Sequence, residues 1–487
     1  MDYFGAIDQG TTSTRFIVYD EEHKQVAQHQ IEIKQYLNQP GYVEHNPEEI
    51  WKSVVDCVNG VSKNFDISLL SSIGITNQRE TTLAWRKSTG EHLHNAIVWQ
   101  DTRTQDICDE IQTFNELKDE FDKTGLPIAT YFSLSKIIWL VRNVDEVKHA
   151  LSEDDLCFGT IDSWLLFKLT GKHQTDITNA SRTLLYDLHK LEWNKIILER
   201  FDIPVNTLPT VKPSLSTFAK ESSLFGNIPI TAVLGDQQAS LFGHKGFNQG
   251  SVKNTYGTGC FMLCNTGDKL VVSTNGLLTT VAYQIENQSP VFALEGSVAF
   301  AGASVQWLRD NLGLIKKSSD VEKLALEVKD NGDVYFVPAF SGLFSPHWDS
   351  SARGTVVGLS RYSNKSHIAR AVLESVAYQT DELLRSLELD VGERENKLLV
   401  DGGMVDNNLL MQFQSDISSL QIQAPDIKEV TAFGAGLASY VYIKKTELKD
   451  IPSTKSSQNW NTNMSVESRN MYISKWNKAI EKAKNWI

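Results

Sequence analysis

The first residues suited to chemistry form a hydroxyl-rich turn, residues 8–15, between two apolar strands. Gly10 has no side chain to cover the backbone N–H groups, and the neighbouring hydroxyl and guanidinium groups suit a phosphate. The acid that ends the first strand is predicted to be a metal ligand instead. A plain polar hairpin turn is the alternative. The acid is Asp8, and the predicted phosphate contacts are Thr11, Thr12, Ser13 and Arg15.

A second acid follows another apolar strand much later in the chain. Asp236 comes directly after residues 231–235 and before Gln237. Ligands collect at such strand ends in open α/β sheets, and an acid there can take the proton of an attacking hydroxyl. The alternative is that Asp236 only caps a helix over residues 237–243. Because Asp8 stands at a matching strand end, we interpret both carboxylates as metal ligands and Asp236 also as the general base.

Two glycine turns in the second half of the chain have a similar composition. Residues 257–259 read Gly-Thr-Gly and mirror the first turn, so that two turns can close on phosphates from opposite sides. Residues 401–408 combine a strand end, two glycines and a helix start, which allows a planar base to lie against the backbone. A hairpin turn and a Gly-Gly loop with an Asn cap are the alternatives.

The pair Arg79-Glu80 follows a short apolar strand over residues 72–76. Arginine can donate hydrogen bonds to neighbouring hydroxyls of a small molecule, and glutamate can accept them. An exposed salt bridge is the commoner role of such a pair. Trp99 and Tyr131 can flank an aliphatic carbon skeleton, although aromatic residues at strand ends are more often part of the core.

The elements that must position these residues occur in the same succession twice. The strand, turn and strand of residues 3–20 recur at residues 251–264, each time followed by alternating helices and strands. This pattern predicts a duplicated α/β fold with mixed or parallel sheets and helices on both faces. We expect the boundary near residues 244–250, where glycines interrupt the pattern. The longest predicted helices cover residues 101–120, 133–150, 366–387 and 466–485.

Composition narrows the class of protein. The 487 residues include 60 acids and 47 bases, and this net charge of −13 argues against nucleic acid or an anionic membrane as the main partner. The five cysteines form no Cys-x-x-Cys pair and predict free thiols in a reducing compartment, the cytoplasm. We expect no signal peptide and no transmembrane segment, because the apolar runs are too short. P-loop and Gly-x-Gly-x-x-Gly motifs are absent from the sequence.

The motifs taken together resemble the glycerol kinases, carbohydrate kinases of the sugar kinase/actin/heat-shock ATPase superfamily. The resemblance covers nearly the whole chain and implies two actin-like (ribonuclease H-like) domains, each a mixed sheet flanked by helices, with a cleft between them. The expected domains are residues 1–246, with the glycerol site and first phosphate loop, and 247–487, with the second phosphate loop and adenosine site. The matching stretches are residues 8–15, 77–81, 97–100, 131–133, 179–183, 235–238, 257–259, 301–309 and 401–403.

The resemblance also implies a reaction and roles for particular residues. The family transfers the γ-phosphate of ATP to glycerol with Mg²⁺, giving sn-glycerol 3-phosphate and ADP, and a homo-oligomer (a dimer or tetramer) is expected. Glycerol would contact Arg79, Glu80, Trp99, Tyr131, Asp236 and Gln237. ATP would contact Thr11, Thr12, Ser13, Arg15, Thr258, Gly302, Gln306, Gly403 and Asn407.

One region departs from the resemblance. Some bacterial members bind fructose 1,6-bisphosphate through a Gly-rich loop with an arginine, and others carry a regulatory phosphohistidine there. The corresponding stretch, residues 224–230, is short and lacks arginine, and no histidine occurs between residues 190 and 243. Two other functions remain open: a kinase of another small polyol or sugar, and a nucleotide-switched binding protein on the same fold. The polar cluster at residues 77–82 argues against the second, which needs no acceptor pocket.

Overall fold

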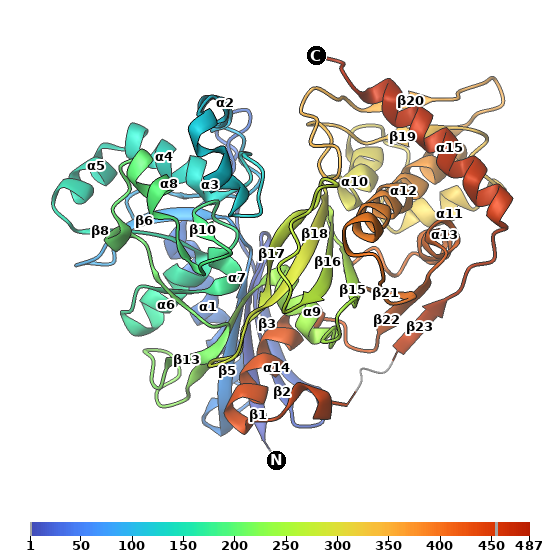
Figure 1. Ribbon diagram of the computed structural model, residues 1–487. Coiled ribbons are helices and arrows are strands. Elements are labelled where there is room, and N and C mark those ends of the chain that lie inside the picture. The colour runs from blue at the N-terminus through green and yellow to red at the C-terminus, as the bar shows by residue number, and fades with distance from the viewer. Residues whose placement is uncertain (1, 453–455) are drawn as a thin grey trace.

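The computed structural model describes residues 2–452 and 456–487, and the chain forms two lobes that each contain a large mixed sheet (Figure 1). The first sheet has the strand order β13-β14-β5-β1-β2-β3. β5 runs parallel to both β1 and β14, and the other neighbours are antiparallel. The strands are β1 (Tyr3–Gln9), β2 (Ser13–Asp20), β3 (Gln25–Glu32), β5 (Leu70–Asn77), β13 (Leu215–Ala219) and β14 (Ile230–Gly235).

The second sheet has the order β17-β18-β16-β15-β21-β22-β23. β21 runs parallel to both β15 and β22, and the remaining pairs are antiparallel. The strands are β15 (Val252–Tyr256), β16 (Cys260–Gly267), β17 (Leu278–Tyr283), β18 (Val291–Val298), β21 (Lys397–Asp401), β22 (Gln421–Pro425) and β23 (Ser456–Trp460).

The two sheets repeat one topology. When the hairpin β15–β16 is matched to β1–β2, β21 takes the place of β5 and β22 that of β14, with the same strand directions. β18 and β23 then match β3 and β13, and β17 is an addition at one edge. The duplicated α/β fold predicted from the sequence is confirmed.

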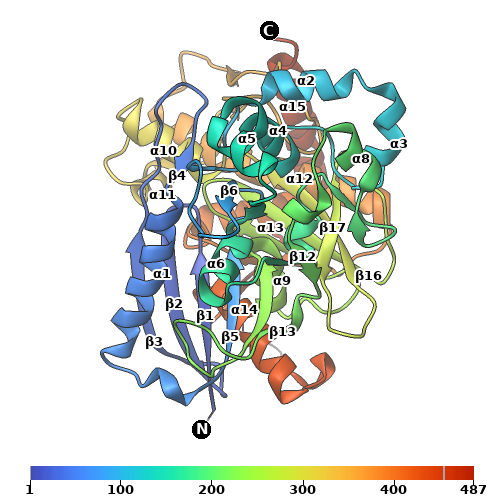
Figure 2. The ribbon, with the colours of Figure 1, turned by 90° about the vertical axis from the view of Figure 1, so that its left-hand side faces the viewer.

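A group of short elements fills the upper part of the first lobe, above and to the right of α1 (Pro47–Ser62) in Figure 2. Its sheet has the order β4-β7-β6-β8 and supplies residues to the site. The strands are β4 (Glu44–His45), β6 (Thr82–Arg86), β7 (Ala96–Ile97) and β8 (Leu156–Thr160), and two small pairs are β9 (Gln174–Asp176) with β12 (Thr210–Lys212) and β10 (Tyr186–Asp187) with β11 (Glu192–Trp193).

Two long helices predicted in this group are shorter in the structure. The segment expected as residues 101–120 is interrupted at residues 113–114, and the segment 133–150 is interrupted at Val144, whose backbone is extended. Neither break contains proline, so local sequence signals do not reveal it. The helices of the group are α2 (Gln105–Gln112), α3 (Lys118–Asp122), α4 (Ser133–Asn143), α5 (Asp145–Ser152), α6 (Ile161–Thr170), α7 (Ile177–Ala180) and α8 (Lys195–Arg200).

Helices of the second half cover its sheet, and the short pair β19 (Tyr335–Val337) and β20 (Thr355–Val357) lies above α12 and beside α15 (Figure 1). The longest helix, α12, begins at the N-cap Asn364, whose side chain accepts backbone N–H groups of the first turn. The helices are α10 (Gly302–Asp310), α11 (Asp320–Ala325), α12 (Lys365–Val391), α13 (Asn408–Ser418) and α15 (Val466–Ala483).

One helix from the second half packs on the first sheet. α14 (Val430–Lys444) lies against β1, β5 and β14 and against α9 (Asp236–Gly243), which joins the two halves. The approach is so close that a Cβ on Gly434 would lie 1.8 Å from the carbonyl oxygen of Ala239. Glycine is therefore required there. The sequence pattern did not predict α14, and the domain division at residue 246 remains a prediction.

Among the described residues, no helix combines the length and apolarity needed to cross a membrane.

Candidate active site

The parallel strands of the first sheet bring the predicted acids to one edge. Asp8 on β1 and Leu234 on β14 both pair in register with Thr76 on β5. The chain leaves β5 towards Arg79 and leaves β14 directly into Asp236. Because parallel strands end at the same edge of a sheet, residues far apart in the sequence meet there.

The acid of the first turn is buried and ion-paired. The side chain of Asp8 is 6% exposed, and its Oδ2 lies 3.1 Å from Nη1 of Arg15. Burial raises the pKa of Asp8 to about 6 against the opposing effect of Arg15, and the negative charge of Asp236 adds to the rise. A second cation near Asp8 would therefore be favourable.

The three hydroxyl residues of the first turn differ in exposure. Thr12 is exposed and Thr11 is partly exposed, whereas the side chain of Ser13 is buried in β2. The turn is closed by the backbone, since the N–H of Gly10 donates to the carbonyl oxygen of Ser13 at 2.9 Å. Thr12, and in part Thr11, are thus accessible to solvent.

The first residue of α9 is the predicted base. Oδ1 of Asp236 accepts the backbone N–H of Gln237 at 2.7 Å and lies 3.1 Å from Nε of Arg79. Burial raises the pKa of Asp236, and the nearby cations Arg79 and Lys253 oppose that rise. Within the described part of the chain these contacts engage Oδ1, so Oδ2 is the oxygen available to take a proton.

A buried lysine from the second sheet supports this region. Nζ of Lys253 donates to Oε1 of Gln237 at 2.5 Å, to Oγ1 of Thr255 at 2.9 Å and to the carbonyl oxygen of Phe261 at 3.2 Å. Burial lowers the pKa of Lys253 to about 8, against the attraction of Asp401 and other acids. Lys253 therefore connects α9 with the strands on either side of the Gly-Thr-Gly turn at residues 257–259.

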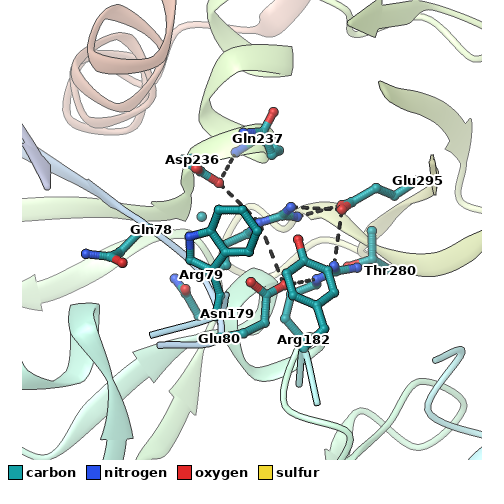
Figure 3. Close-up of polar contacts among 12 residues, drawn as sticks. Gln78, Arg79, Glu80, Asn179, Arg182, Asp236, Gln237, Thr280 and Glu295 are labelled. Carbon is teal, nitrogen blue, oxygen red and sulfur yellow. Dashed lines mark hydrogen bonds and ion pairs between the residues drawn. The ribbon is translucent and has the colours of Figure 1, made fainter. Parts of the chain in front are cut away.

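Arg79 and Glu80 find separate partners (Figure 3). The two side chains are 4.0 Å apart at their closest charged atoms. Nη1 and Nη2 of Arg79 donate to the two carboxylate oxygens of Glu295 at 2.6 and 2.8 Å. Oε1 of Glu80 accepts from Nε of Arg182 at 2.6 Å. The exposed salt bridge considered from the sequence is not what forms, because both side chains are 2% exposed.

Aromatic rings line the region beside these charges. The ring centroid of Trp99 lies 5.6 Å from that of Tyr131 and 5.9 Å from that of Phe261, both edge to face. Trp99 also donates from Nε1 to Oγ1 of Thr11 at 3.0 Å. The aromatic cluster therefore contacts the turn between β1 and β2 directly.

The second half contains a pocket of about 380 Å³ that brings together its predicted nucleotide contacts. Close packing shapes it, since a Cβ on Gly302 would lie 2.7 Å from the carbonyl oxygen of Gly257. At Gly403 a Cβ would meet no atom within 4 Å, so this backbone faces open space. The pocket is lined by Thr258, Gly302, Gln306, Gly403 and Asn407, together with Glu322 and other residues.

No preformed metal cage is present among the described residues, in which no cluster of three or more His, Cys, Asp or Glu side chains is suitably arranged. The two acids near the first turn, Asp8 and Asp236, remain close enough to raise the pKa of Asp8. Mg²⁺ typically binds through one or two carboxylates together with phosphate and water oxygens. The two residues fit that type of ligand set.

Comparison with known sequences decides the family. The N-terminal domain of the FGGY family of carbohydrate kinases matches residues 3–243, and the C-terminal domain of the same family matches residues 252–441. This chain belongs to the FGGY family of carbohydrate kinases. The first segment contains every strand of the first large sheet, and the second contains those of the second large sheet except β23.

Several relatives of this carbohydrate kinase are similar along its full length. The glycerol kinase of Brucella anthropi is 49% identical over 498 residues, which cover 100% of this chain and 99% of the relative. Glycerol kinase 1 of Streptomyces avermitilis is 47% identical over 500 residues, covering 100% and 98%. The crystal structure of Plasmodium falciparum glycerol kinase with ADP superposes with a TM-score of 0.92 at 39% identity, covering 99% of this chain and 98% of that chain.

Four site residues of this carbohydrate kinase received no role from the sequence, namely Arg182, Glu295, Lys253 and Phe261. Glu295, Lys253 and Phe261 all come from the second half and meet residues of the first half. Phe261 and Lys253 flank the Gly-Thr-Gly turn, which offers a weak signal. Glu295 gives a stronger one, because a single acid inside the apolar strand β18 must find a buried partner.

Proposed function

We propose that this carbohydrate kinase is an ATP:glycerol 3-phosphotransferase, which converts glycerol and ATP to sn-glycerol 3-phosphate and ADP. The observation that carries the proposal is the convergence of Arg79, Glu80 and Asp236 beside the rings of Trp99 and Tyr131. Three polar side chains match three hydroxyls, and the aromatic edge suits a short carbon skeleton. Full-length identity of 46–49% to several glycerol kinases supports the same acceptor.

The proposed reaction is a direct transfer. The terminal hydroxyl oxygen of glycerol attacks the γ-phosphorus and forms the new O–P bond, while the bond from that phosphorus to the bridging oxygen breaks and ADP leaves. Asp236 takes the hydroxyl proton, in keeping with its raised pKa. Arg79, Glu80, Tyr131 and Gln237 orient the acceptor, and Trp99 packs on its carbons.

The nucleotide would lie between the two halves in this proposal. The phosphates would contact the turns that carry Thr11, Thr12, Ser13 and Arg15 on one side and Thr258 on the other. The adenosine end would occupy the pocket at Gly302, Gln306, Gly403 and Asn407. Bound Mg²⁺, held by Asp8 and Asp236, would neutralise charge on the phosphates.

The test is an acceptor panel with ATP and Mg²⁺, in which ADP formation is measured with glycerol, erythritol, xylulose, ribulose and gluconate. We expect the highest kcat/KM with glycerol. A higher kcat/KM with xylulose, ribulose or gluconate would contradict the proposed acceptor. Acceptor-independent ADP release at the full rate would instead favour the nucleotide-switched binding protein.

We also propose a cytoplasmic homo-oligomer, a dimer or tetramer. The structure leaves all five cysteines as free, buried thiols, which suits a reducing compartment. Sedimentation velocity of the purified protein tests the oligomer, and a monomer at micromolar concentration would contradict it. Cell fractionation tests the compartment, and recovery outside the cytoplasmic fraction would contradict that part.

A further inference from the structure

One buried carboxylate, that of Glu295, joins Arg79 and Arg182. Both arginines lie at the proposed acceptor site, called the acceptor region below, which consists of Arg79, Glu80, Asp236, Trp99 and Tyr131. Both oxygens of Glu295 accept hydrogen bonds from Arg79, at 2.6 and 2.8 Å, and Oε1 also lies 3.1 Å from Nη2 of Arg182. The side chain of Glu295 is 0% exposed. Burial alone would raise the pKa of Glu295, but the guanidinium groups of Arg182 and Arg79 hold it below its usual value. Glu295 is therefore the anion shared by both cations.

The contact with Glu295 determines how Arg79 faces the site. The guanidinium group is planar, and a bidentate carboxylate fixes the orientation of that plane. The stem of Arg79 is confined as well, because a Cβ on Gly235 would lie 2.6 Å from its Cδ. With the terminal nitrogens engaged, Nε faces Asp236 at 3.1 Å, and Figure 3 shows Asp236 and Glu295 on different sides of the guanidinium.

Arg182 links Glu295 to Glu80 and so restrains the position of Glu80 as well. Nε of Arg182 donates to Oε1 of Glu80, and Nη2 of Arg182 approaches Glu295. Glu80 has a φ of 59°, in the left-handed region that favours glycine. A non-glycine residue is held in that conformation only when its surroundings impose it. The Arg182 contact is one such restraint, and Glu295 in turn restrains Arg182.

Glu295 comes from a different half of the chain than the residues it holds. It lies on β18 of the second sheet, whereas Arg79, Glu80 and Arg182 belong to the first lobe. All four side chains are at most 2% exposed, so none of them can exchange its partner for bulk water. Loss of the Glu295 charge would leave two buried cations competing for the remaining acids.

We propose that Glu295 is a positioning residue for the acceptor: from the second half of the chain, it fixes Arg79 directly and Glu80 through Arg182. The proposal rests on the proposed function only in naming glycerol as the acceptor. If Glu295 has this role, the acceptor region keeps its geometry only while the two halves of the chain are correctly placed against each other. Glu295 itself stays behind the guanidinium groups and acts through them.

The test compares Glu295→Gln and Glu295→Asp with the unaltered enzyme in steady-state kinetics. Glu295→Gln keeps the shape and removes the charge, and we expect the KM for glycerol to rise about 10- to 100-fold. The KM for ATP should change less than about threefold, because Glu295 does not line the nucleotide pocket. Glu295→Asp keeps the charge but shortens the reach, and we expect a smaller rise in the KM for glycerol.

The matched control is Asp381→Asn on α12. Asp381 is a buried acid of the same half, ion-paired with Arg385 at 3.0 Å, and it contacts none of the acceptor residues named above. We expect this variant to keep the KM for glycerol. Equal rises in the KM for glycerol in both variants would show that Glu295 is merely structural and would overturn the proposal.

Glu295→Asp keeps the proposal testable if Glu295→Gln does not fold. An unchanged KM for glycerol in Glu295→Asp, with unchanged thermal unfolding, would overturn the positioning role. Failure of the proposed function is recognised separately, because the unaltered enzyme would then prefer another acceptor. The same variants are then measured with that acceptor, and the same split between acceptor KM and ATP KM is expected.

Discussion

Trp99 and Thr11 connect the aromatic cluster of the site to the turn between β1 and β2 through one hydrogen bond. The indole Nε1 donates to Oγ1 of Thr11 at 3.0 Å, although the residues lie 88 positions apart in the sequence. The same indole packs edge to face against Tyr131 and Phe261. A substitution at Trp99 should therefore alter the position of Thr11, and a substitution at Thr11 should alter the position of Trp99.

We expect Trp99→Phe to lower kcat/KM for glycerol and also to raise the KM for ATP. Phenylalanine keeps an aromatic ring but cannot donate to Thr11, so the turn loses a restraint. Thr11→Val removes the acceptor of the same bond. In a double-mutant cycle, the two changes should show a coupling of about 0.5–1.5 kcal/mol in kcat/KM. Strict additivity would show that the bond does not contribute.

Asp236 and Asp8 should separate in their response to magnesium. Asp236→Asn cannot take a proton, and loss of a general base costs about 10²–10⁴-fold in kcat. A loose transition state would place the loss at the lower end. Asp8→Asn should instead raise the Mg²⁺ concentration needed for half-maximal rate. Kinetics over a Mg²⁺ titration checks both, and rescue of Asp236→Asn by excess Mg²⁺ would make Asp236 a metal-side residue only.

Deprotonation of Lys253 should reduce the activity of the enzyme at alkaline pH. Burial lowers its pKa to about 8, so its charge is present below that pH and is lost as the pH rises through it. We expect kcat/KM to fall above about pH 8 in the unaltered enzyme. Lys253→Met should reduce kcat/KM roughly 10-fold or more at neutral pH and abolish this limb.

Lys136 is the comparison variant for that experiment. Its pKa is also lowered to about 8 by burial, and its Nζ donates to backbone carbonyls at residues 130–132. If the alkaline limb persists in Lys253→Met and disappears in Lys136→Met, the assignment to Lys253 is wrong.

Asp162, a buried acid away from the site, should lower the free energy of unfolding as the pH rises. Burial and the nearby charge of Asp176 raise the pKa of Asp162 from 3.8 to about 7. The stability linked to this proton is fully present below the unfolded pKa and is lost as the pH rises through about 7. Relative to the unaltered protein, Asp162→Asn should gain about 2–3 kcal/mol between pH 5 and pH 8.

Urea unfolding at several pH values measures this difference. The exposed acid Asp145, whose side chain is 91% exposed, provides the control variant Asp145→Asn. Its stability difference from the unaltered protein should be nearly constant from pH 5 to pH 8. A constant difference for Asp162→Asn as well would refute the raised pKa.

Fructose 1,6-bisphosphate should not inhibit this kinase. The stretch at residues 224–230 carries no arginine or lysine that could pair with a phosphate. We expect the initial rate to stay unchanged up to millimolar effector at saturating substrates. Inhibition at sub-millimolar concentration would contradict this and would point to a site assembled from more than one subunit.

The sequence alone was sufficient to predict the short local motifs of the site. A strand that ends in an acid, and turns of glycine and threonine, are properties of a few consecutive residues, so Asp8, Asp236 and the turn at residues 257–259 were recognisable. The duplication was recognisable for the same reason, since each copy repeats the local pattern. Periodicity overestimated the helices at residues 101–120 and 133–150, where the chain bends without proline or glycine.

Only the tertiary structure decided which charges share the site. Glu295 meets Arg79 across 216 positions, and the sequence pair Arg79-Glu80 is separated into two ion pairs. α14 returns to the first sheet because glycines such as Gly434 permit close contact with α9. A buried charge must be paired. Its partner depends on which strands the fold places together, and the residues next to it in the sequence do not reveal that partner.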